Sequence, residues 1–471
     1  MPATQAAAAP ARLSFRTLPL PDGVLAANAG RDPRGEPAPG GAPLPDDSDS
    51  SRRVPRLLDL LAGREDVVSW VREGYGLVGW GRVLCLEACG PDRIEALRTA
   101  WRATVYASWW RDPLVRPGTG PVALGTIAFS PVSAATSVLV VPRVLVGLDA
   151  VGTWVTTAVP EGQKHPALAD LLDELRAAGP LTPVSPPGDS APVVATGSLT
   201  EEAYLAAVAQ TQRRMAAGEA RKVVLARDVL VSPPAPLATG DLLRRLGAGY
   251  PSCWSFAVDA MVGATPELLV RLSGRRLASR VLAGTARRSP GEPAAREREA
   301  ARLAQWLEAS SKNRAEHELA RSSALTALEP LCSVVEASAP HVLTLPNVLH
   351  LATDITGVAA GDTGALSLVR ALHPTAAVCG TPTAAAARII ADVEGMDRGR
   401  YAGPVGWVDW HGEGEWCIAL RCAALPPGGA GPQAPARVFG GGGIMPDSVP
   451  ADELAETQAK MRPMLSALTA S

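Results

Sequence analysis

Residues Thr200–Val231 read T-E-E-A-Y-L-A-A-V-A-Q-T-Q-R-R-M-A-A-G-E-A-R-K-V-V-L-A-R-D-V-L-V, a helical pattern followed by a strand pattern. Thr200 can cap a helix whose first turn carries two glutamates, and the positive end of a helix dipole favours such acidic residues. Apolar residues then recur on one helical face, and Gly218 can end the helix. The β-rich segment Val223–Val231 follows, so a predicted helix leads into a strand that starts beside Lys222.

The same alternation of apolar runs and turn residues continues toward the C-terminus. A long helix rich in Ala and Glu is predicted from about Ala294 to Leu328, and a final helix covers roughly Ala451–Leu468. The Pro- and Gly-rich stretch Leu425–Ala436 is typical of a hairpin connection. Strands are predicted at Leu269–Leu272, Leu277–Leu282, Gly406–Trp410, Trp416–Ala423 and Arg437–Phe439.

Two segments rich in Pro, Gly, Asp and Ser, Arg31–Ser51 and Gly179–Gly197, have the composition of linkers. They predict three parts of the chain. Residues 1–52 form a disordered or loosely ordered tail, residues 53–197 form a scaffold that ends in a linker, and residues 198–471 form the catalytic part.

The composition is that of a soluble globular enzyme with a sizeable core, because 47% of the 471 residues are apolar and 20% are charged. The net charge of −2 and the aromatic content of 4% argue against nucleic-acid binding. The sequence contains no uninterrupted apolar run of about 18 residues, so no membrane-spanning helix is predicted. The seven cysteines are scattered without a zinc-type spacing, which favours reduced thiols in a cytoplasmic protein.

Lys222 and Glu267 each have an ordinary and a functional interpretation. A lysine at the start of a strand is usually a solvated edge residue, but burial or a nearby positive charge would lower its pKa enough for a general base. Glu267 lies in G-A-T-P-E-L, Gly263–Leu268, where Pro266 restricts Thr265 to extended geometry. A glutamate in a turn is normally exposed, but in an apolar cleft it would keep a proton and serve as a general acid.

Charged residues on two predicted helices have the same double interpretation. Lys312 and Glu316 are four residues apart, which suits a surface ion pair. Glu453, Glu456 and Lys460 share one face of the last helix. Carboxylates from the two helices, if they met, would hold a hard divalent cation such as Mg²⁺.

Three further features are ambiguous by themselves. The run F-G-G-G-G-I, Phe439–Ile444, is either a flexible turn or an anion-binding nest, and it lacks the pattern of a nucleotide-binding loop. Arg421 lies among apolar residues of a predicted strand and would need a carboxylate partner if buried. His373 is a lone histidine, and such residues are more often structural than catalytic.

The order of the segments is more specific than any one of them. Over about residues 198–466 the chain presents K-V-V-L-A-R, G-A-T-P-E-L-L, L-A-G-T-A-R-R, S-x-K-N-R-x-E-H-E-L, L-H-P-T-A-A-V-C-G-T-P, Y-A-G-P-V-G-W-V-D, G-E-G-E-W-C-I-A-L-R-C, the glycine run and E-L-A-E-T-Q-A-K. This succession resembles the chorismate-utilising enzyme family, which includes isochorismate, salicylate, anthranilate and aminodeoxychorismate synthases. The resemblance implies an α+β fold in which large antiparallel β-sheets pack as a central sandwich with helices outside.

The resemblance also implies a role for each candidate residue. Lys222 would activate the water that attacks C2 of chorismate, and Glu267 would protonate the departing C4 hydroxyl. Magnesium would be the cofactor, and its ligands would be Glu316 and Glu456, with Glu453 binding directly or through water. The residues implied to bind the substrate are Tyr401, Arg421, Lys460 and backbone amides near Gly441 and Gly442 at the enolpyruvyl carboxylate, and Gly284, Thr285 and His373 at the ring.

Two positions favour the water-using branch of the family. Lysine at 222 suits water as the nucleophile, and Ala283 stands where aminodeoxychorismate synthases have a nucleophilic lysine. The resemblance therefore implies an isochorismate synthase, an isomerase that needs no glutaminase subunit and acts as a monomer. A salicylate synthase, which goes on to eliminate pyruvate, and a non-catalytic chorismate-binding protein are the alternatives. Menaquinone and siderophore synthesis both stay open as destinations of the product.

The chain departs from the usual family pattern at a few positions. Asn313 replaces an aspartate, Thr265 stands where serine is common, and F-G-G-G-G replaces A-G-A-G. None of these changes removes a proposed catalytic group.

Overall fold

The structure is a computed structural model that describes residues 10–21, 23–25, 56–64, 66–176, 192–287, 293–344 and 348–469. In these ranges the helices are α1 (Arg93–Ala107), α2 (Leu168–Arg176), α3 (Glu201–Ala216), α4 (Thr239–Gly249), α5 (Pro293–Ala309), α6 (Ser311–Leu328), α7 (Ala365–Leu372), α8 (Thr383–Val393) and α9 (Pro450–Thr469), with short 3₁₀ turns η2 (Leu57–Leu61) and η3 (Glu329–Leu331).

The strands make up most of the interior of the protein. They are β1 (Leu13–Pro19), β2 (Val68–Arg72), β3 (Tyr75–Ala88), β4 (Trp109–Arg111), β5 (Val122–Thr126), β6 (Ser137–Leu148), β7 (Thr153–Pro160), β8 (Val193–Thr196), β9 (Lys222–Ser232), β10 (Trp254–Val258), β11 (Met261–Thr265), β12 (Leu268–Ser273), β13 (Arg276–Arg287), β14 (Cys332–Ala337), β15 (His341–Thr344), β16 (Val348–Ala359), β17 (Gly380–Thr381), β18 (Pro404–Asp409), β19 (Gly414–Ile418), β20 (Cys422–Ala424) and β21 (Ala436–Ile444).

The strands form one hydrogen-bonded network with two halves. One half runs β4–β1–β7–β6–β3–β2–β10–β11–β20–β21–β9, and the other runs β6–β5–β18–β19–β12–β13–β16. Strand β6 belongs to both halves, because its first part pairs with β5 and its last part pairs with β7. Every pairing of named strands among the described residues is antiparallel except the short β1–β4 contact.

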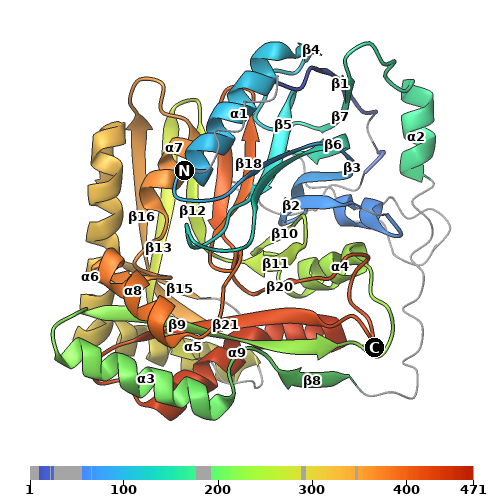
Figure 1. Cartoon of the computed structure of the whole chain (residues 1–471). Coiled ribbons are helices and arrows are strands. Elements are labelled where there is room, and N and C mark those ends of the chain that lie inside the picture. Colours follow the sequence, from blue (N-terminus) through green and yellow to red (C-terminus); the bar gives the residue numbers. More distant parts are fainter. Residues whose placement is uncertain are drawn as a thin grey trace, which may run out of the picture.

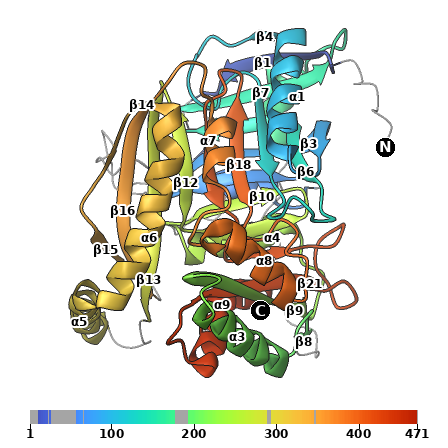
Figure 2. The same cartoon turned by 60° about the vertical axis from the view of Figure 1, so that its left-hand side comes forward.

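The two halves pack against each other through large apolar and aromatic side chains. Trp70 of β2 and Trp254 of β10 both donate their indole N–H to the Glu415 Oε1 atom of β19, at 2.7 Å each. One core cluster contains these tryptophans together with residues of β5, β12 and β19. The helices lie outside, with α5 and α6 beside β13 and β16, and α3 and α9 against β9 and β21 (Figures 1 and 2). The predicted α+β fold class is confirmed.

The N-terminal tail prediction is wrong for Leu13–Pro19. This segment is β1, which pairs with β7, because its alternating sequence buries Leu13 and Phe15 in the core. The predicted linker Gly179–Gly197 is likewise wrong at its end, where Val193–Thr196 forms β8 on the edge of β9. Most of the rest of both predicted segments, residues 26–55 and 177–191, lies outside the described residues.

Two further predictions about elements are corrected. The predicted helix Ala294–Leu328 is two helices that meet at Ser310, whose hydroxyl caps α6 by accepting a hydrogen bond from the Asn313 amide. The predicted strand Arg437–Phe439 extends to Ile444 and so includes the whole glycine run. Of the helices in the described ranges, none is long and apolar enough to cross a membrane.

Candidate active site

A small cavity of about 80 Å³ lies where β9 and β21 meet β11, β13 and the helices α6 and α9. Nine of the predicted site residues line it, although they are spread over more than two hundred positions of the chain. They are Lys222, Glu267, Gly284, Glu316, Tyr401, Arg421, Gly441, Glu456 and Lys460. The amine and the carboxyl predicted to act as base and acid therefore open into the same space.

Lys222 is buried and paired. It is the first residue of β9 and only 2% exposed, so the surface interpretation of this lysine is excluded. Its Nζ atom donates to Glu316 Oε1 of α6 at 2.7 Å. A buried ammonium needs such a partner, and this contact links the predicted base to a predicted metal ligand.

Glu267 is held in an apolar setting between β11 and β12. Burial raises its pKa to about 7, although the positive charges of Arg421, Lys460 and Lys222 oppose the shift. The preceding Thr265 fixes the backbone, because its hydroxyl donates to the Ile418 carbonyl at 2.6 Å and accepts from the Glu267 amide at 3.3 Å. A carboxyl with this pKa holds a proton near neutral pH and can donate it.

The glycine run is neither a turn nor an anion nest, which corrects the prediction from sequence. Gly440–Gly443 lie in the extended strand β21, paired with β9. A Cβ atom at Gly443 would lie 3.1 Å from Lys222 Cε and 3.4 Å from Glu316 Oε1, and one at Gly442 would lie 3.1 Å from Glu453 Oε2. The missing side chains therefore make room for the charged groups that cross this strand.

The three predicted metal ligands come from two helices on either side of β21. Glu456 of α9 is paired with Lys460 at 2.6 Å, just as Glu316 is paired with Lys222. Glu453 lies one turn before Glu456, does not line the cavity, and accepts a hydrogen bond from the Ser448 hydroxyl at 2.6 Å. Within the described ranges no three His, Cys, Asp or Glu side chains are grouped closely enough to chelate an ion. Glu316 and Glu456 together suit Mg²⁺, which prefers few carboxylates plus waters and substrate oxygens.

The predicted substrate-binding side chains Tyr401, Arg421 and Lys460 all line the cavity. Burial raises the pKa of Tyr401, which stacks on Phe439 with the ring centroids 4.8 Å apart, so its hydroxyl stays neutral. Arg421 does not lie inside a strand as predicted, because it occupies the connection between β19 and β20 with a φ of 48°. Lys460 also donates to the Gly441 carbonyl at 2.8 Å.

The three residues predicted to lie at the substrate ring differ in where the structure places them. Gly284 lines the cavity at a β-bulge in β13, with a φ of 80° that suits glycine. Thr285 follows it in the same strand, and its side chain lies outside the part that the structure describes.

His373 does not line this cavity. Its Nε2 atom lies 3.0 Å from the Phe129 carbonyl, and its ring meets Phe129 edge-on. It lines a neighbouring cavity of about 250 Å³ that also contains Glu267. The histidine in the site is instead His350 of β16, whose pKa burial lowers to about 3, so it is neutral. Sequence reasoning missed it, although a histidine between two leucines in a strand is an available signal.

A second missed feature is the buried pair of Glu394 and Arg398. Both are nearly inaccessible, and Arg398 binds the carboxylate through two bonds of 2.6 Å each. Glu394 also accepts from the Ala226 amide of β9, and Arg398 donates to the Val224 carbonyl at 2.7 Å. This pair anchors β9 behind the cavity, where Arg398 forms part of the wall.

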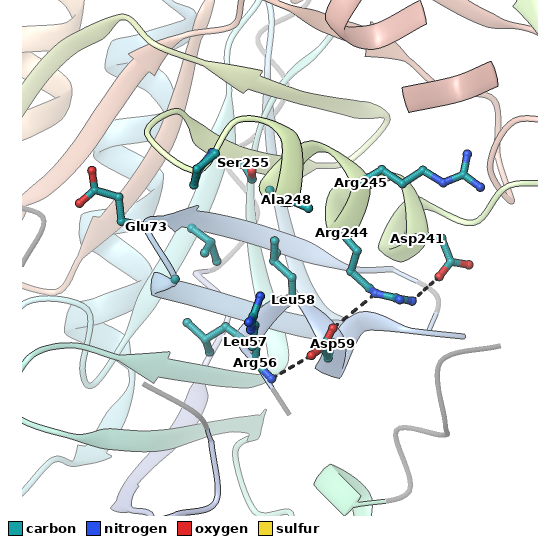
Figure 3. Close-up of a pocket in the computed structure, with 14 residues that line it drawn as sticks. Arg56, Leu57, Leu58, Asp59, Glu73, Asp241, Arg244, Arg245, Ala248 and Ser255 are labelled. Carbon is teal, nitrogen blue, oxygen red and sulfur yellow. Dashed lines mark hydrogen bonds and ion pairs between the residues drawn. The ribbon is translucent and has the colours of Figure 1, made fainter. Parts of the chain in front are cut away.

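A larger cavity lies elsewhere. It measures about 350 Å³ and is bounded by η2, the β2–β3 turn and α4 (Figure 3). Three of its charged groups pair with each other, since Arg244 contacts Asp59 at 3.4 Å and Asp241 at 2.9 Å. None of the predicted site residues lines it.

A cavity that combines a buried amine, a carboxyl with a raised pKa and two lysine-paired carboxylates has the groups that acid–base catalysis requires. The family described as chorismate binding enzyme matches residues 67–469, and the chain belongs to this family.

Similarity to named proteins supports this family membership. "Putative isochorismate synthase MenF" of Mycobacterium tuberculosis is 37% identical over 369 residues, which cover 75% of this chain and 88% of that protein. Isochorismate synthase DhbC of Bacillus subtilis is 37% identical over 280 residues, covering 57% of this chain and 68% of that one. The structure of MenF, the menaquinone-specific isochorismate synthase from Escherichia coli, superposes with a TM-score of 0.68 at 22% identity, covering 98% of this chain and 96% of that chain, and so shares the fold.

Proposed function

We propose that this chain is a magnesium-dependent isochorismate synthase, which adds water at C2 of chorismate and removes the C4 hydroxyl. The single observation that carries the proposal is that Lys222 and Glu267, from distant parts of the chain, line one cavity. The names of two relatives, each 37% identical, support the same reaction. Ala283 lines the cavity at the position where a nucleophilic lysine would mark the aminodeoxychorismate branch.

The base and the acid divide the proton transfers between them. Lys222 takes a proton from the water that attacks C2, and the two ring double bonds shift. The C4–oxygen bond then breaks with its electron pair on oxygen, and Glu267 supplies the proton that makes the leaving group water. One water is consumed near Lys222 and one is released near Glu267.

Positive and neutral groups prepare the site for a dianionic substrate. Arg421 and Lys460 offer charge-assisted hydrogen bonds to a carboxylate, and the neutral Tyr401 hydroxyl adds a third donor. His350 stays neutral beside them, so it can hydrogen-bond to the substrate without adding charge.

Glu316 and Glu456 would hold the magnesium ion, with Glu453 adjacent on α9. When bound, the ion supplies positive charge that orients and neutralises a substrate carboxylate. Glu316, which pairs with Lys222, would thus connect the proposed metal site to the proposed base.

The test is to incubate the purified chain with chorismate and Mg²⁺ and separate the products by chromatography. Isochorismate as the sole product supports the proposal. Salicylate with pyruvate would assign the chain to the salicylate synthases. Binding of chorismate without turnover, at any Mg²⁺ concentration, would show a non-catalytic binding protein.

A further inference from the structure

The 250 Å³ cavity next to the active site adjoins the proposed acid. Glu267 and Ala377 line both cavities, so the two spaces meet at this carboxyl. The walls of the larger cavity are mostly small side chains of α6, such as Ala320 and Ala324, and the segment that follows α7. Ser323 of α6 also lines it and is exposed, so the cavity reaches the surface of the protein.

Two polar atoms in this wall have no hydrogen-bond partner among the described residues. They are the Nδ1 atom of His373 and the hydroxyl of Thr375, and both are buried. A buried polar group without a partner is costly, and ordered water is its usual partner when the space is large enough. Both residues line the same cavity as Glu267, and its volume exceeds that of several water molecules.

The charge of the wall argues against a route for the substrate. Arg280 is the one cationic side chain in the lining of this cavity, and its guanidinium is engaged by Asp354 at 2.6 Å. A dianion entering here would meet no other positive charge until it reached Lys222, Arg421 and Lys460, the groups that face Glu267 from the active-site side. Water can enter such a space at much lower cost.

The proposed reaction, on which this inference rests, requires a path at this point. Each turnover releases one water beside Glu267 and leaves this carboxylate without its proton, while Lys222 has gained one. The released water must leave, and Glu267 must regain a proton from solvent, before the next turnover. We propose that the cavity behind Glu267 is a water-filled channel, and that Thr375 and His373 position the waters that carry product water out and protons in.

The first test removes one hydroxyl. Thr375→Val should lower kcat about tenfold with KM changed less than twofold, and should raise the solvent deuterium isotope effect on kcat. Thr375→Ser should restore both values, which a purely structural role of the threonine methyl group would not explain. Unchanged kcat and isotope effect in Thr375→Val would overturn the proposal.

The second test fills the channel. Ala324→Leu adds bulk inside the cavity, and Thr326→Leu on the exposed face of the same helix is the matched control. A selective fall in kcat for Ala324→Leu supports the channel, whereas a selective rise in KM would show a substrate entrance and overturn it. If wild-type protein does not convert chorismate, the proposed function fails first.

A measurement that does not need turnover distinguishes failure of the channel proposal from failure of the proposed function. A high-resolution crystal structure of the full chain should show ordered waters bonded to His373 Nδ1 and the Thr375 hydroxyl. A dry cavity would overturn the channel even in an active enzyme.

Discussion

The 350 Å³ cavity and the smaller cavity that holds the candidate active site differ in how their charges are placed. In the 350 Å³ cavity Arg244 lies between two aspartates, and all three side chains are partly exposed (Figure 3). In the 80 Å³ cavity Lys222 and Glu267 are almost inaccessible.

Burial changes what a charged group can do. Partly exposed ion pairs contribute little to stability and keep ordinary chemistry, because water screens them. A buried carboxyl or amine is forced toward its neutral form unless another group pairs with it, and this is what prepares acids and bases for catalysis. The volume of a cavity is therefore a poorer guide to function than the burial of its charges.

Lys222→Ala is expected to have the largest effect. Removing the amine should abolish water addition, a loss of at least about a thousandfold in kcat, because the proposed general base is lost. Chorismate binding, measured by calorimetry, should persist. Turnover near the wild-type rate would show that the buried lysine only balances the charge of Glu316.

Glu267→Gln should lower kcat roughly a hundredfold or more, since general acid catalysis is lost. In wild type, activity should fall as pH rises through about 7, because the acid must be protonated. Stability shifts in the same window. The folded state keeps a proton that the unfolded chain has lost, so wild-type stability decreases between pH 4.5 and about 7.

The raised pKa of Glu267 corresponds to a decrease of about 3 kcal/mol in the free energy of unfolding between pH 4.5 and about 7. The Glu267→Gln variant should lack this decrease. Chemical denaturation of both proteins at pH 5 and pH 8 measures it. Parallel pH dependence in the two proteins would contradict the raised pKa.

Glu316→Gln should raise the Mg²⁺ concentration needed for half-maximal activity about tenfold or more, because one of the proposed carboxylate ligands is lost. Glu318→Gln is the matched control, since this neighbour on α6 is exposed and pairs with Arg321. Thermal unfolding at increasing Mg²⁺ gives a readout that does not need turnover. The same metal dependence in both variants would exclude Glu316 from the metal site.

Arg244→Gln tests the 350 Å³ cavity and should have the smallest effect. Its ion pairs are partly exposed, so their loss should cost no more than about 1 kcal/mol. Isochorismate formation should stay within twofold of wild type, since no group of the acid–base site is touched. A large fall in kcat would mean that this cavity is coupled to the chemistry.

Sequence patterns predicted best those parts of the molecule in which local order decides structure. The capped helix before β9 is present, and Thr200 accepts the capping hydrogen bond from Ala203 as expected. The family resemblance supplied the convergence of Lys222 and Glu267, which spacing alone cannot show. Each taken alone had an ordinary surface interpretation, and only tertiary packing decides against it.

Most of the wrong predictions have one physical cause, which is that long-range packing outweighed the local sequence pattern. The glycine run has a local composition that favours turns, but pairing with β9 along its whole length makes it a strand. His373 and His350 both follow a leucine in apolar segments, and only the tertiary fold determines which of them lines the 80 Å³ cavity. The strand Leu13–Pro19 likewise depends on pairing with the distant strand β7, whereas the helix break at Ser310 has a local signal, the serine cap of α6.

Four successive glycines in β21 also restrict how this protein could be engineered. Glycine in a strand costs roughly 0.5–1 kcal/mol relative to alanine, so replacing these residues looks like an easy gain in thermal tolerance. Yet alanine at 442 or 443 would press on the carboxylates and on the lysine. Attempts to stabilise the fold, or to widen the range of compounds it accepts, should therefore keep the glycines of β21. They should instead change other residues that line the cavity, such as Leu282, Val378 and Leu420.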